Sequence, residues 1–362
     1  MSNELSSDAF AEDSGDLPNP QNTMLEFGNK FGGRLKNVGS VKRLYHYTNT
    51  EGLFGIISTG ELWASEVSYL NDKSENFYSR KVSERTIKKL SNDENDKLLR
   101  RFLDVLAHLL GSYRNLPEPD SDSIYTNDYK SHDTYVVSLC EKRDLLSQWR
   151  GYSGNGSGHS IGLDVERLNN NLQGYHLVPI IYEPALQHDI AENVVMKSLK
   201  YLRKRDFSVF DGMSLSEEAV VLNIALWTVE NLDFLGLRFK DESFIEENEW
   251  RLIERIPRTV RLGSGLPAKT SPSAIYRNDR PLINFRTRGS QLVPYATFRL
   301  RSAREVAIGF QDDKNPITDI TVGPGNDFEK ARYAINHLFA YCGLHPATHE
   351  ILRSKIPYAV PI

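Results

Sequence analysis

The stretch "RLYHYTNTEGLFGIISTGELWASEVSYLND", residues 43–72, has the most regular pattern in the chain. Its apolar spacing predicts a strand, a short helix and a second strand, over Leu44–Tyr47, Glu51–Ser58 and Leu62–Ser65. Thr48 or Asn49 can cap the helix at its start, and Gly60 follows its end as a C-cap glycine does. The pattern also places a lone histidine, His46, inside an apolar strand.

Beyond this unit the chain mixes strands and helices without regular alternation. We expect helical insertions at about 74–110 and 186–238, strands at 134–140 and 159–164, and strand-rich sequence before the helix-forming segment near the C-terminus. In "SLSE", residues 214–217, Ser214 is the expected N-cap of the last long helix. This order predicts an α+β fold with mixed, mostly antiparallel sheets.

The composition is that of a globular protein. Of 362 residues, 40% are hydrophobic and 25% are charged, so a large core can form. Residues 1–40 are polar and predict a mobile N-terminal arm, with residues 41–362 as a single α+β domain. No uninterrupted apolar run reaches membrane-spanning length, and the acidic start does not resemble a signal peptide, so we expect no membrane partner and a cytoplasmic protein.

Two compositional features limit the chemistry. Cys140 and Cys342 lie in apolar surroundings without a CxxC or Cys/His cluster, which predicts reduced thiols and no metal site. Residues 255–304 hold eleven basic side chains and one acid in a chain of net charge -4. This segment is either a nucleic-acid or phosphate contact or a solvated strand face.

Three clusters could carry chemistry. In "YHYT", residues 45–48, strand alternation puts His46 and Thr48 on one face and Tyr45 and Tyr47 on the other. His46 can donate a hydrogen bond to a ligand hydroxyl beside a helix N-terminus, or it can be a satisfied structural histidine.

The second cluster, "SQWRGYSGNGSG", residues 147–158, combines an aromatic, a guanidinium and a phenol beside a glycine-rich turn. Arg150 can clamp a phosphate, and Trp149 or Tyr152 can stack on a flat ring. The alternative is a core position for Trp149 and an ion pair of Arg150 with Asp144 or Glu141. The glycine spacing fits neither a phosphate loop nor a dinucleotide fold, which favours a flexible connection.

The third cluster is "EENEWRLI", residues 246–253. Glu249 and Arg251 share a strand face, and Glu247 can join them in an E-x-E pair that binds a ribose hydroxyl, stabilises a cation or acts as a base. A solvated acidic surface is the alternative.

In order, these clusters and "RSKIPY", residues 353–358, resemble the landmarks of the bacterial domain of unknown function 2971 family. The first unit is also similar to the first strand and helix of NAD-using ADP-ribosyltransferases. In those enzymes a first-strand basic residue grips the nicotinamide-side ribose, a middle-strand Ser or Tyr lies against nicotinamide, and a late glutamate supports the oxocarbenium-like transition state.

The resemblance therefore implies an ADP-ribosyltransferase-like core with NAD as substrate. It gives the first role to His46 and the last to Glu249, with Glu247 completing the E-x-E. Ser138 and Tyr152 both remain open for the middle role. Arg150 would hold the pyrophosphate, and Tyr47 and Thr48, beside His46, join the same cofactor-binding set.

The implied function is an ADP-ribosyl transfer enzyme, a glycosyltransferase by chemistry, that modifies a macromolecule in the manner of a toxin or anti-phage defence effector. Two other classes fit the residues. One is a non-catalytic nucleic-acid-binding module built on residues 255–304, whose affinity would fall steeply with salt. The other is an RNA-processing or phosphate-transfer enzyme in which His46 and Arg150 handle phosphates.

Overall fold

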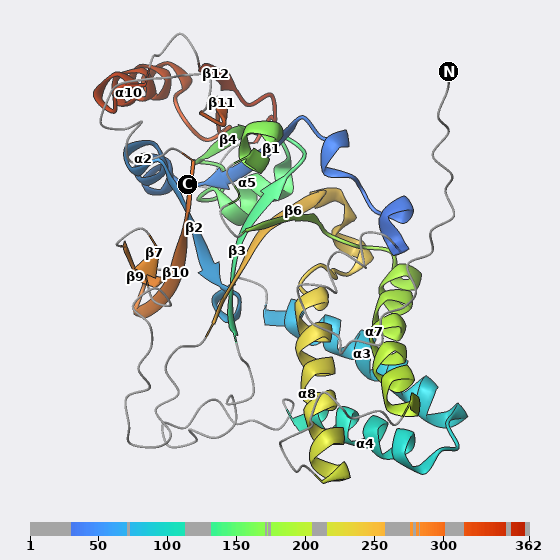
Figure 1. Ribbon diagram of the computed structural model, residues 1–362. Helices are drawn as coiled ribbons and strands as arrows, with labels where there is room; N and C mark the ends of the chain where they lie inside the picture. Colours follow the sequence, from blue (N-terminus) through green and yellow to red (C-terminus); the bar gives the residue numbers. More distant parts are fainter. Residues whose placement is uncertain are drawn as a thin grey trace, which may run out of the picture. The chain divides into compact units, whose positions relative to one another are not determined.

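The computed structural model describes residues 30–70, 73–112, 132–170, 172, 175–204, 216–257, 276–277, 280–281, 283–300, 315–344 and 349–358. Within these ranges the chain has the predicted α+β fold, with a mostly antiparallel open sheet and helical insertions (Figure 1). It divides into two compact units. Unit 1 comprises residues 1–31, 78–123 and 185–237, and unit 2 the remainder. The expected arm, residues 1–40, lies largely outside the described residues.

Unit 1 is helical in its described part. It contains α4 (Lys97–Ser112), α8 (Glu217–Gly236), all of α7 (Pro184–Lys204) but its first residue, and α3 (Lys73–Asp93) from Tyr78 onward. α4 buries an apolar stripe at helical spacing, including Phe102, Leu103 and Leu106, and packs against α8. α8 is long and apolar enough to cross a membrane, but 61% of its apolar window is buried, as in the core helix of a globular unit.

The predicted cap of α8 is wrong. Ser216, not Ser214, is the N-cap, and its Oγ accepts a hydrogen bond from the Ala219 amide at 3.3 Å. Ser214 lies outside the described residues. The capping-box spacing, with a glutamate three residues after the cap, fits Ser214 and not Ser216, so this motif marks the helix start only to within two positions.

Unit 2 contains a sheet of ten strands in the described ranges, in the order β12-β11-β4-β1-β3-β2-β10-β9, with β6 on β3 and β5 on β6. The strands are β1 (Arg43–Thr48), β2 (Glu61–Glu66), β3 (His132–Cys140), β4 (His159–Asp164), β5 (His176–Pro179), β6 (Glu249–Pro257), β9 (Ile283–Arg288), β10 (Gln291–Arg299), β11 (Ile317–Val322) and β12 (Glu350–Arg353). β11 and β12 are parallel, and the other described pairs are antiparallel. β7 (Tyr276–Arg277) and β8 (Arg280–Pro281) form a separate pair.

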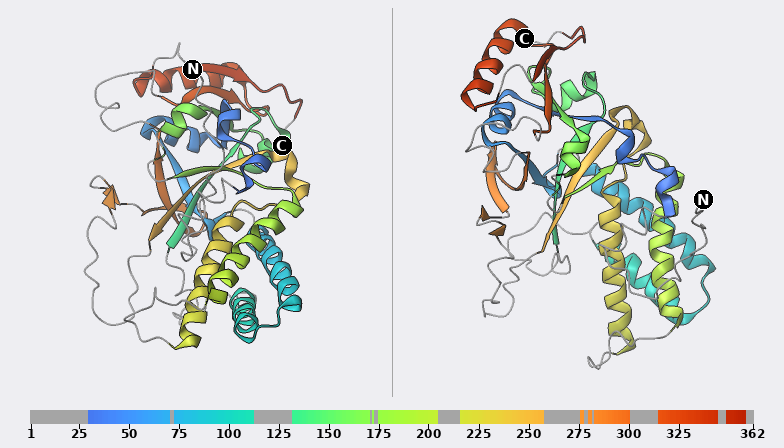
Figure 2. Two further views of the ribbon diagram at one scale, coloured as in Figure 1. Left: turned by 45° about the vertical axis from the view of Figure 1, so that its right-hand side comes forward. Right: turned by 45° about the horizontal axis from the view of Figure 1, so that its top comes forward.

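The helices of unit 2 are α2 (Thr50–Thr59), α5 (Leu146–Tyr152), α6 (Val165–Asn170) and α10 (Phe328–Tyr341); the described 3-10 turns of the chain are η1 (Gly32–Arg34), η2 (Val38–Ser40), η3 (Val67–Tyr69) and η5 (Glu242–Glu247) (Figure 2). α2 begins where Asn49 accepts a hydrogen bond from the Gly52 amide at 2.8 Å. It ends at Gly60, whose φ of 69° is left-handed and suits glycine. Local sequence therefore sets both ends of α2.

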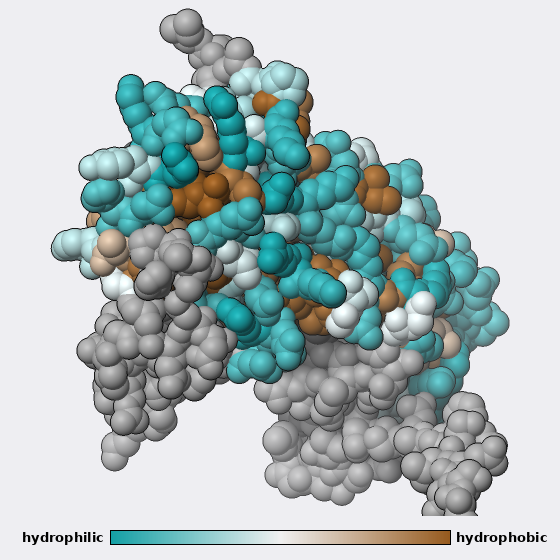
Figure 3. Space-filling model, turned by 90° about the horizontal axis from the view of Figure 1, so that it is seen from above, coloured by the Kyte–Doolittle hydropathy of each residue, from teal (hydrophilic) through white to brown (hydrophobic). Residues whose placement is uncertain are grey.

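The main core of unit 2 lies where α2 and α10 pack against the sheet. Ile57 of α2 and Phe339 of α10 are fully buried in one apolar cluster with Ile161 of β4. A smaller cluster of Tyr45, Tyr47, Cys140 and Trp149 lies apart from it. On the face seen in Figure 3, hydrophobic residues form separate patches among hydrophilic ones.

Candidate functional site

The candidate site lies where β1 and β2 separate along one edge of β3. The other edge of β3 pairs with β6 along its whole length. The edge of β3 that faces β1 and β2 is paired only in part. β1 pairs with it at Cys140, and β2 pairs with it at Tyr135 and Val136. The ladder is therefore interrupted between these points, at Val137–Leu139, and a pocket of about 200 Å³ opens beside the gap.

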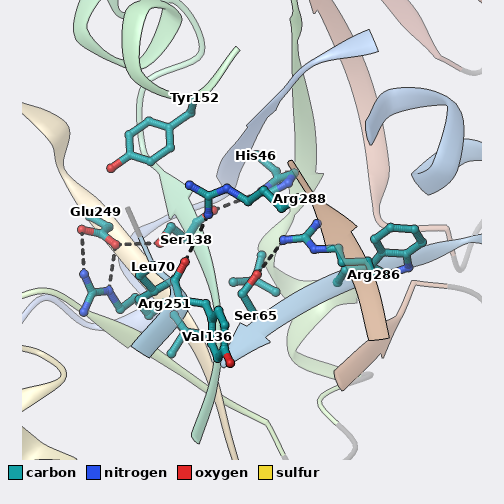
Figure 4. A pocket seen from close by; sticks show the side chains of 13 residues that line it. His46, Ser65, Leu70, Val136, Ser138, Tyr152, Glu249, Arg251, Arg286 and Arg288 are labelled. Carbon is teal, nitrogen blue, oxygen red and sulfur yellow. Dashed lines mark hydrogen bonds and ion pairs between the residues drawn. The ribbon is translucent and has the colours of Figure 1, made fainter. Parts of the chain in front are cut away.

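The pocket gathers side chains that are far apart in sequence. Its lining residues come from β1, β2, β3, β6, β9, the end of α5 and the turn after β2 (Figure 4). They are His46, Trp63, Ser65, Tyr69, Leu70, Val136, Val137, Ser138, Tyr152, Glu249, Arg251, Arg286 and Arg288. Thus four predicted site residues, His46, Ser138, Tyr152 and Glu249, line one cavity.

His46 fills the gap in the ladder. Its Nδ1 lies 3.1 Å from the Ser138 carbonyl oxygen, which can only accept, so Nδ1 carries the proton. Burial lowers the pKa of the His46 imidazole below its ordinary value, the bond to Ser138 opposes this shift, and nearby Arg286 adds to it. The ring is therefore neutral at pH 7, and Nε2 presents a lone pair. A ligand hydroxyl would donate to His46, the reverse of the direction expected from sequence.

This protonation state predicts a pH dependence. Because the folded pKa of His46 is depressed, its contribution to stability is present above pH about 6.5 and is lost as the pH falls through the folded pKa. Urea unfolding at pH 7 and pH 5 should show a larger loss of unfolding free energy for the wild type than for His46→Gln. Identical losses would show that the ring is not held neutral.

Glu249 opens β6 and is held by three side chains. Asn248 precedes it with a left-handed φ of 43°, which ends η5 and turns the chain into the strand. Glu249 Oε1 accepts from Ser138 Oγ at 2.9 Å and from Arg251 Nε at 2.7 Å. Oε2 accepts from Lys240 Nζ at 2.9 Å. The carboxylate is thus fixed toward the pocket by Ser138, a predicted partner, and by two buried cations.

The electrostatics of Glu249 follow from these partners. Burial alone would raise the pKa of its carboxyl, but Arg251 and Lys240 outweigh burial and hold that pKa below the ordinary value. The group is therefore ionised at neutral pH. A carboxylate that is already charged and oriented suits stabilisation of a positive charge better than proton abstraction.

Glu247 contacts the site through Lys240 and does not line the pocket. Its Oε2 accepts from Lys240 Nζ at 2.6 Å, so one buried lysine joins both glutamates of the predicted E-x-E pair. Its carbonyl oxygen accepts a hydrogen bond from Cys140 Sγ at 2.9 Å. Glu247 is not a pocket-lining residue, and its contacts indicate a positioning role.

Tyr152 reaches the pocket from the end of α5, and the turn that follows is firmly anchored. The amides of Gly323 and Gly325 donate to the carbonyls of Gly158 and Gly156 at 2.9 and 3.0 Å. Asn326 Nδ2 donates to the Ser157 carbonyl at 2.7 Å. The glycine-rich turn, expected to be a flexible connection, is therefore tied to the turn after β11.

The C-terminal "RSKIPY" segment also holds α5. Asp144 accepts hydrogen bonds from Trp149 Nε1, Ser354 Oγ and the Lys355 amide, each at 2.7 Å. Tyr358 donates to Asn155 Oδ1 at 2.9 Å. This motif thus links the end of the chain to the helix that carries Tyr152.

We expect Asp144→Ala to lower the free energy of unfolding by about 2–3 kcal/mol, because the buried Trp149 Nε1 would lose its acceptor. Amide exchange in residues 354–358 should accelerate in the same variant. The exposed Glu166, in the first turn of α6, is a suitable control, since Glu166→Ala should change stability by about 1 kcal/mol or less. Equal effects of the two substitutions would exclude the linking role of Asp144.

Three predicted cofactor-binding residues are not pocket-lining residues. Tyr47 is buried in the small cluster, with its ring 4.9 Å from Trp149 and its hydroxyl bonded to the Lys142 carbonyl. Thr48 ends β1. Arg150 is exposed, and its guanidinium lies over the Tyr358 ring at 5.1 Å, not in an ion pair with Asp144 or Glu141. The core alternative for Trp149 is correct.

Sequence reasoning did not single out Trp63, Ser65, Arg286 and Arg288. The two arginines belong to the basic segment 255–304, but composition alone could not place them in the same cavity as His46. Residues 258–275, 278–279, 282 and 301–304 of that segment lie outside the described residues.

Comparison with protein-family models gives a match over part of the chain. Residues 148–252 match the model of a family described as "Protein of unknown function (DUF2971)". The match covers the segment from Gln148 in α5 to Leu252 in β6, including Tyr152 and Glu249, and supports the predicted resemblance to that family. Neither the curated proteins nor the solved structures give a match.

Proposed function

We propose that the protein is an NAD-dependent ADP-ribosyltransferase-like enzyme that acts on a macromolecule. The observation that carries this proposal is the meeting of His46, Ser138 and Glu249 at one pocket in the gap between β1 and β2. Their order along the chain is also the order in which the resemblance assigns the three roles. NAD would be a substrate that is consumed in the reaction.

The chemistry required is stabilisation of a cation. When the bond between nicotinamide and ribose breaks, its electron pair leaves with nicotinamide and positive charge develops on the sugar. An ionised Glu249 beside the ribose would stabilise that charge most in the transition state. Four contacts hold this carboxylate at 2.7–3.3 Å, so it needs little reorganisation as the charge develops.

The other groups would orient the substrate. His46 Nε2 would accept a hydrogen bond from a ribose hydroxyl, which the neutral ring permits. Ser138, bonded to Glu249, takes the middle role beside the nicotinamide in this proposal, and Tyr152, at 38% exposure, adds a ring on which the nicotinamide can stack. The pocket is smaller than the roughly 300–1,000 Å³ of typical drug-sized sites, so only one end of the dinucleotide would enter it.

The experiment uses purified full-length protein, NAD labelled in its adenylate part, and cell lysate. Label should enter macromolecules with wild-type protein and fall by about 10²–10³-fold with Glu249→Gln. The neighbouring exposed Glu246 gives the control, because Glu246→Gln should retain activity. Absence of labelling, or equal labelling by both variants, would reject the function.

The acceptor in this proposal is an anionic macromolecule such as a nucleic acid, because basic side chains of residues 255–304 reach the pocket through Arg286 and Arg288. Treating the labelled lysate with nuclease and with protease separates the possibilities. Label that survives nuclease and is released by protease would assign a protein acceptor instead.

A further inference from the structure

The two sides of the pocket differ in charge balance. At one side, Glu249 accepts from Arg251 and Lys240, and Lys240 also binds Glu247, so two anions face two cations. Arg286 and Arg288 come from β9. Among the described lining residues, Glu249 is the sole carboxylate, and its oxygens are already bonded (Figure 4). The β9 wall of the pocket is therefore cationic.

Arg286 is held in place by neutral groups. Its Nη2 donates to Ser65 Oγ at 2.7 Å, and its guanidinium lies 5.7 Å from the centre of the Trp63 ring. Trp63 is itself stacked on Tyr295, with ring centres 4.7 Å apart. Within the described part of the chain, Arg286 has no ion pair with a carboxylate, and its buried Nε has no hydrogen-bond partner. A half-buried cation is thus oriented toward the pocket without a counter-ion there.

Arg288 is the second cation of this wall. Strand alternation puts it on the same face of β9 as Arg286. Its Nη1 donates to the Tyr69 carbonyl at 3.1 Å, which directs the guanidinium over the pocket. Burial lowers the pKa of Arg286, and the charge of Arg288 lowers it further, so an anion bound beside Arg286 would offset both effects.

We propose that Arg286 and Arg288 bind the diphosphate of the nucleotide substrate. Planar guanidiniums bind phosphate oxygens in a bidentate manner, and two of them from one strand face at one pocket can bind two linked phosphates. A diphosphate at this wall would leave the attached ribose beside His46 and Glu249. The assignment rests on the proposed function for the identity of the substrate, and it moves the phosphate-binding role from Arg150 to residues on β9.

The test is equilibrium binding of ADP-ribose, which contains the diphosphate but no bond to nicotinamide. Isothermal titration of the full-length protein at low salt should give an affinity about tenfold weaker for Arg286→Gln and for Arg288→Gln, and about 100-fold weaker for the double variant. Arg150→Gln should bind like the wild type. Rising salt should weaken wild-type binding more than binding by the double variant.

Two further ligands show whether the arginines bind the diphosphate of a nucleotide or the backbone of a nucleic acid. Nicotinamide riboside, which lacks phosphate, should bind the wild type and the double variant equally. Loss of affinity for a single-stranded oligonucleotide with unchanged affinity for ADP-ribose would overturn the proposal in favour of a nucleic-acid contact. Unchanged ADP-ribose binding in the double variant, or a loss confined to Arg150→Gln, would also overturn it.

Binding and turnover can fail separately. ADP-ribose binding that depends on both arginines, without any cleavage of NAD, would keep the diphosphate site and reject the enzyme activity. Cleavage of NAD by a protein whose affinity for ADP-ribose is unchanged in the double variant would keep the enzyme activity and reject the diphosphate site.

Discussion

Lys240→Met should lower the free energy of unfolding by about 3–5 kcal/mol, because it removes the one cation shared by two buried carboxylates. Lys240 is 3% exposed, so water cannot replace its charge. Glu247 would lose its bond to Lys240, and Glu249 would keep only Arg251 and Ser138. The pKa of Glu249 should then rise, since Lys240 is one of the two cations that lower it.

Urea unfolding of matched variants measures this effect. Lys330→Met removes an exposed lysine with an ion pair of the ordinary surface kind and should change stability by about 1 kcal/mol or less. The double variant Lys240→Met/Glu247→Gln should recover part of the lost unfolding free energy, because it removes one of the two buried carboxylate charges that Lys240 binds. A Lys240→Met protein as stable as Lys330→Met would show that the buried network contributes no stability.

Gly158→Ala should be the second severe substitution. A Cβ at this position would overlap the Thr48 carbonyl oxygen and lie 2.6 Å from the Ser153 carbonyl oxygen. Both obstacles are backbone, so relief requires movement of β1 or of the turn after α5. We expect a loss of about 3 kcal/mol or more in unfolding free energy.

Gly151→Ala provides the matched control, seven residues away on α5. A Cβ there meets nothing within 4 Å, so alanine should stabilise the helix by up to about 1 kcal/mol. Thermal unfolding of both variants gives the comparison. Similar shifts for the two would contradict the close approach of Gly158 to β1.

Local sequence determined the parts of the fold that were predicted well. The unit from β1 to β2 carries its own signals, an asparagine cap and a left-handed glycine, so its strand, helix and turn follow from 24 residues, Arg43–Glu66. The cap of α8 was misplaced by two residues because the capping-box spacing fits Ser214 and Glu217, whereas the true cap, Ser216, has Ala219 three residues later. Capping motifs constrain the neighbourhood of a helix start better than the residue itself.

Strand alternation and the resemblance together pointed to His46 and Glu249, and the resemblance left Ser138 and Tyr152 open for the middle role. All four line the pocket. Tyr47 was included in the site although alternation already placed it on the opposite face, and it lies in the core beside Trp149. Arg150 was chosen because it precedes the glycine turn, but the C-terminal Tyr358 lies against it.

The remaining site residues depend on pairings between distant segments. Arg286 reaches the pocket because β9 pairs with β10 and β10 with β2, which spans more than 200 residues of sequence. Lys240 reaches Glu249 because η5 and Asn248 fold the chain back over nine residues. Neither contact leaves a periodic pattern in the sequence around Arg286 or Lys240.

The central claim is that the pocket cleaves the bond between nicotinamide and ribose with Glu249 as the charge-stabilising group. The most direct test incubates the protein with NAD, without an added acceptor, and measures the nicotinamide released by chromatography. Glu249→Gln should lower kcat by about 10²–10³-fold with little change in KM, and Ser138→Ala, which leaves the buried charges in place, should lower kcat less. Folded wild-type protein that releases no nicotinamide, or a folded Glu249→Gln variant with wild-type kcat, would contradict the claim.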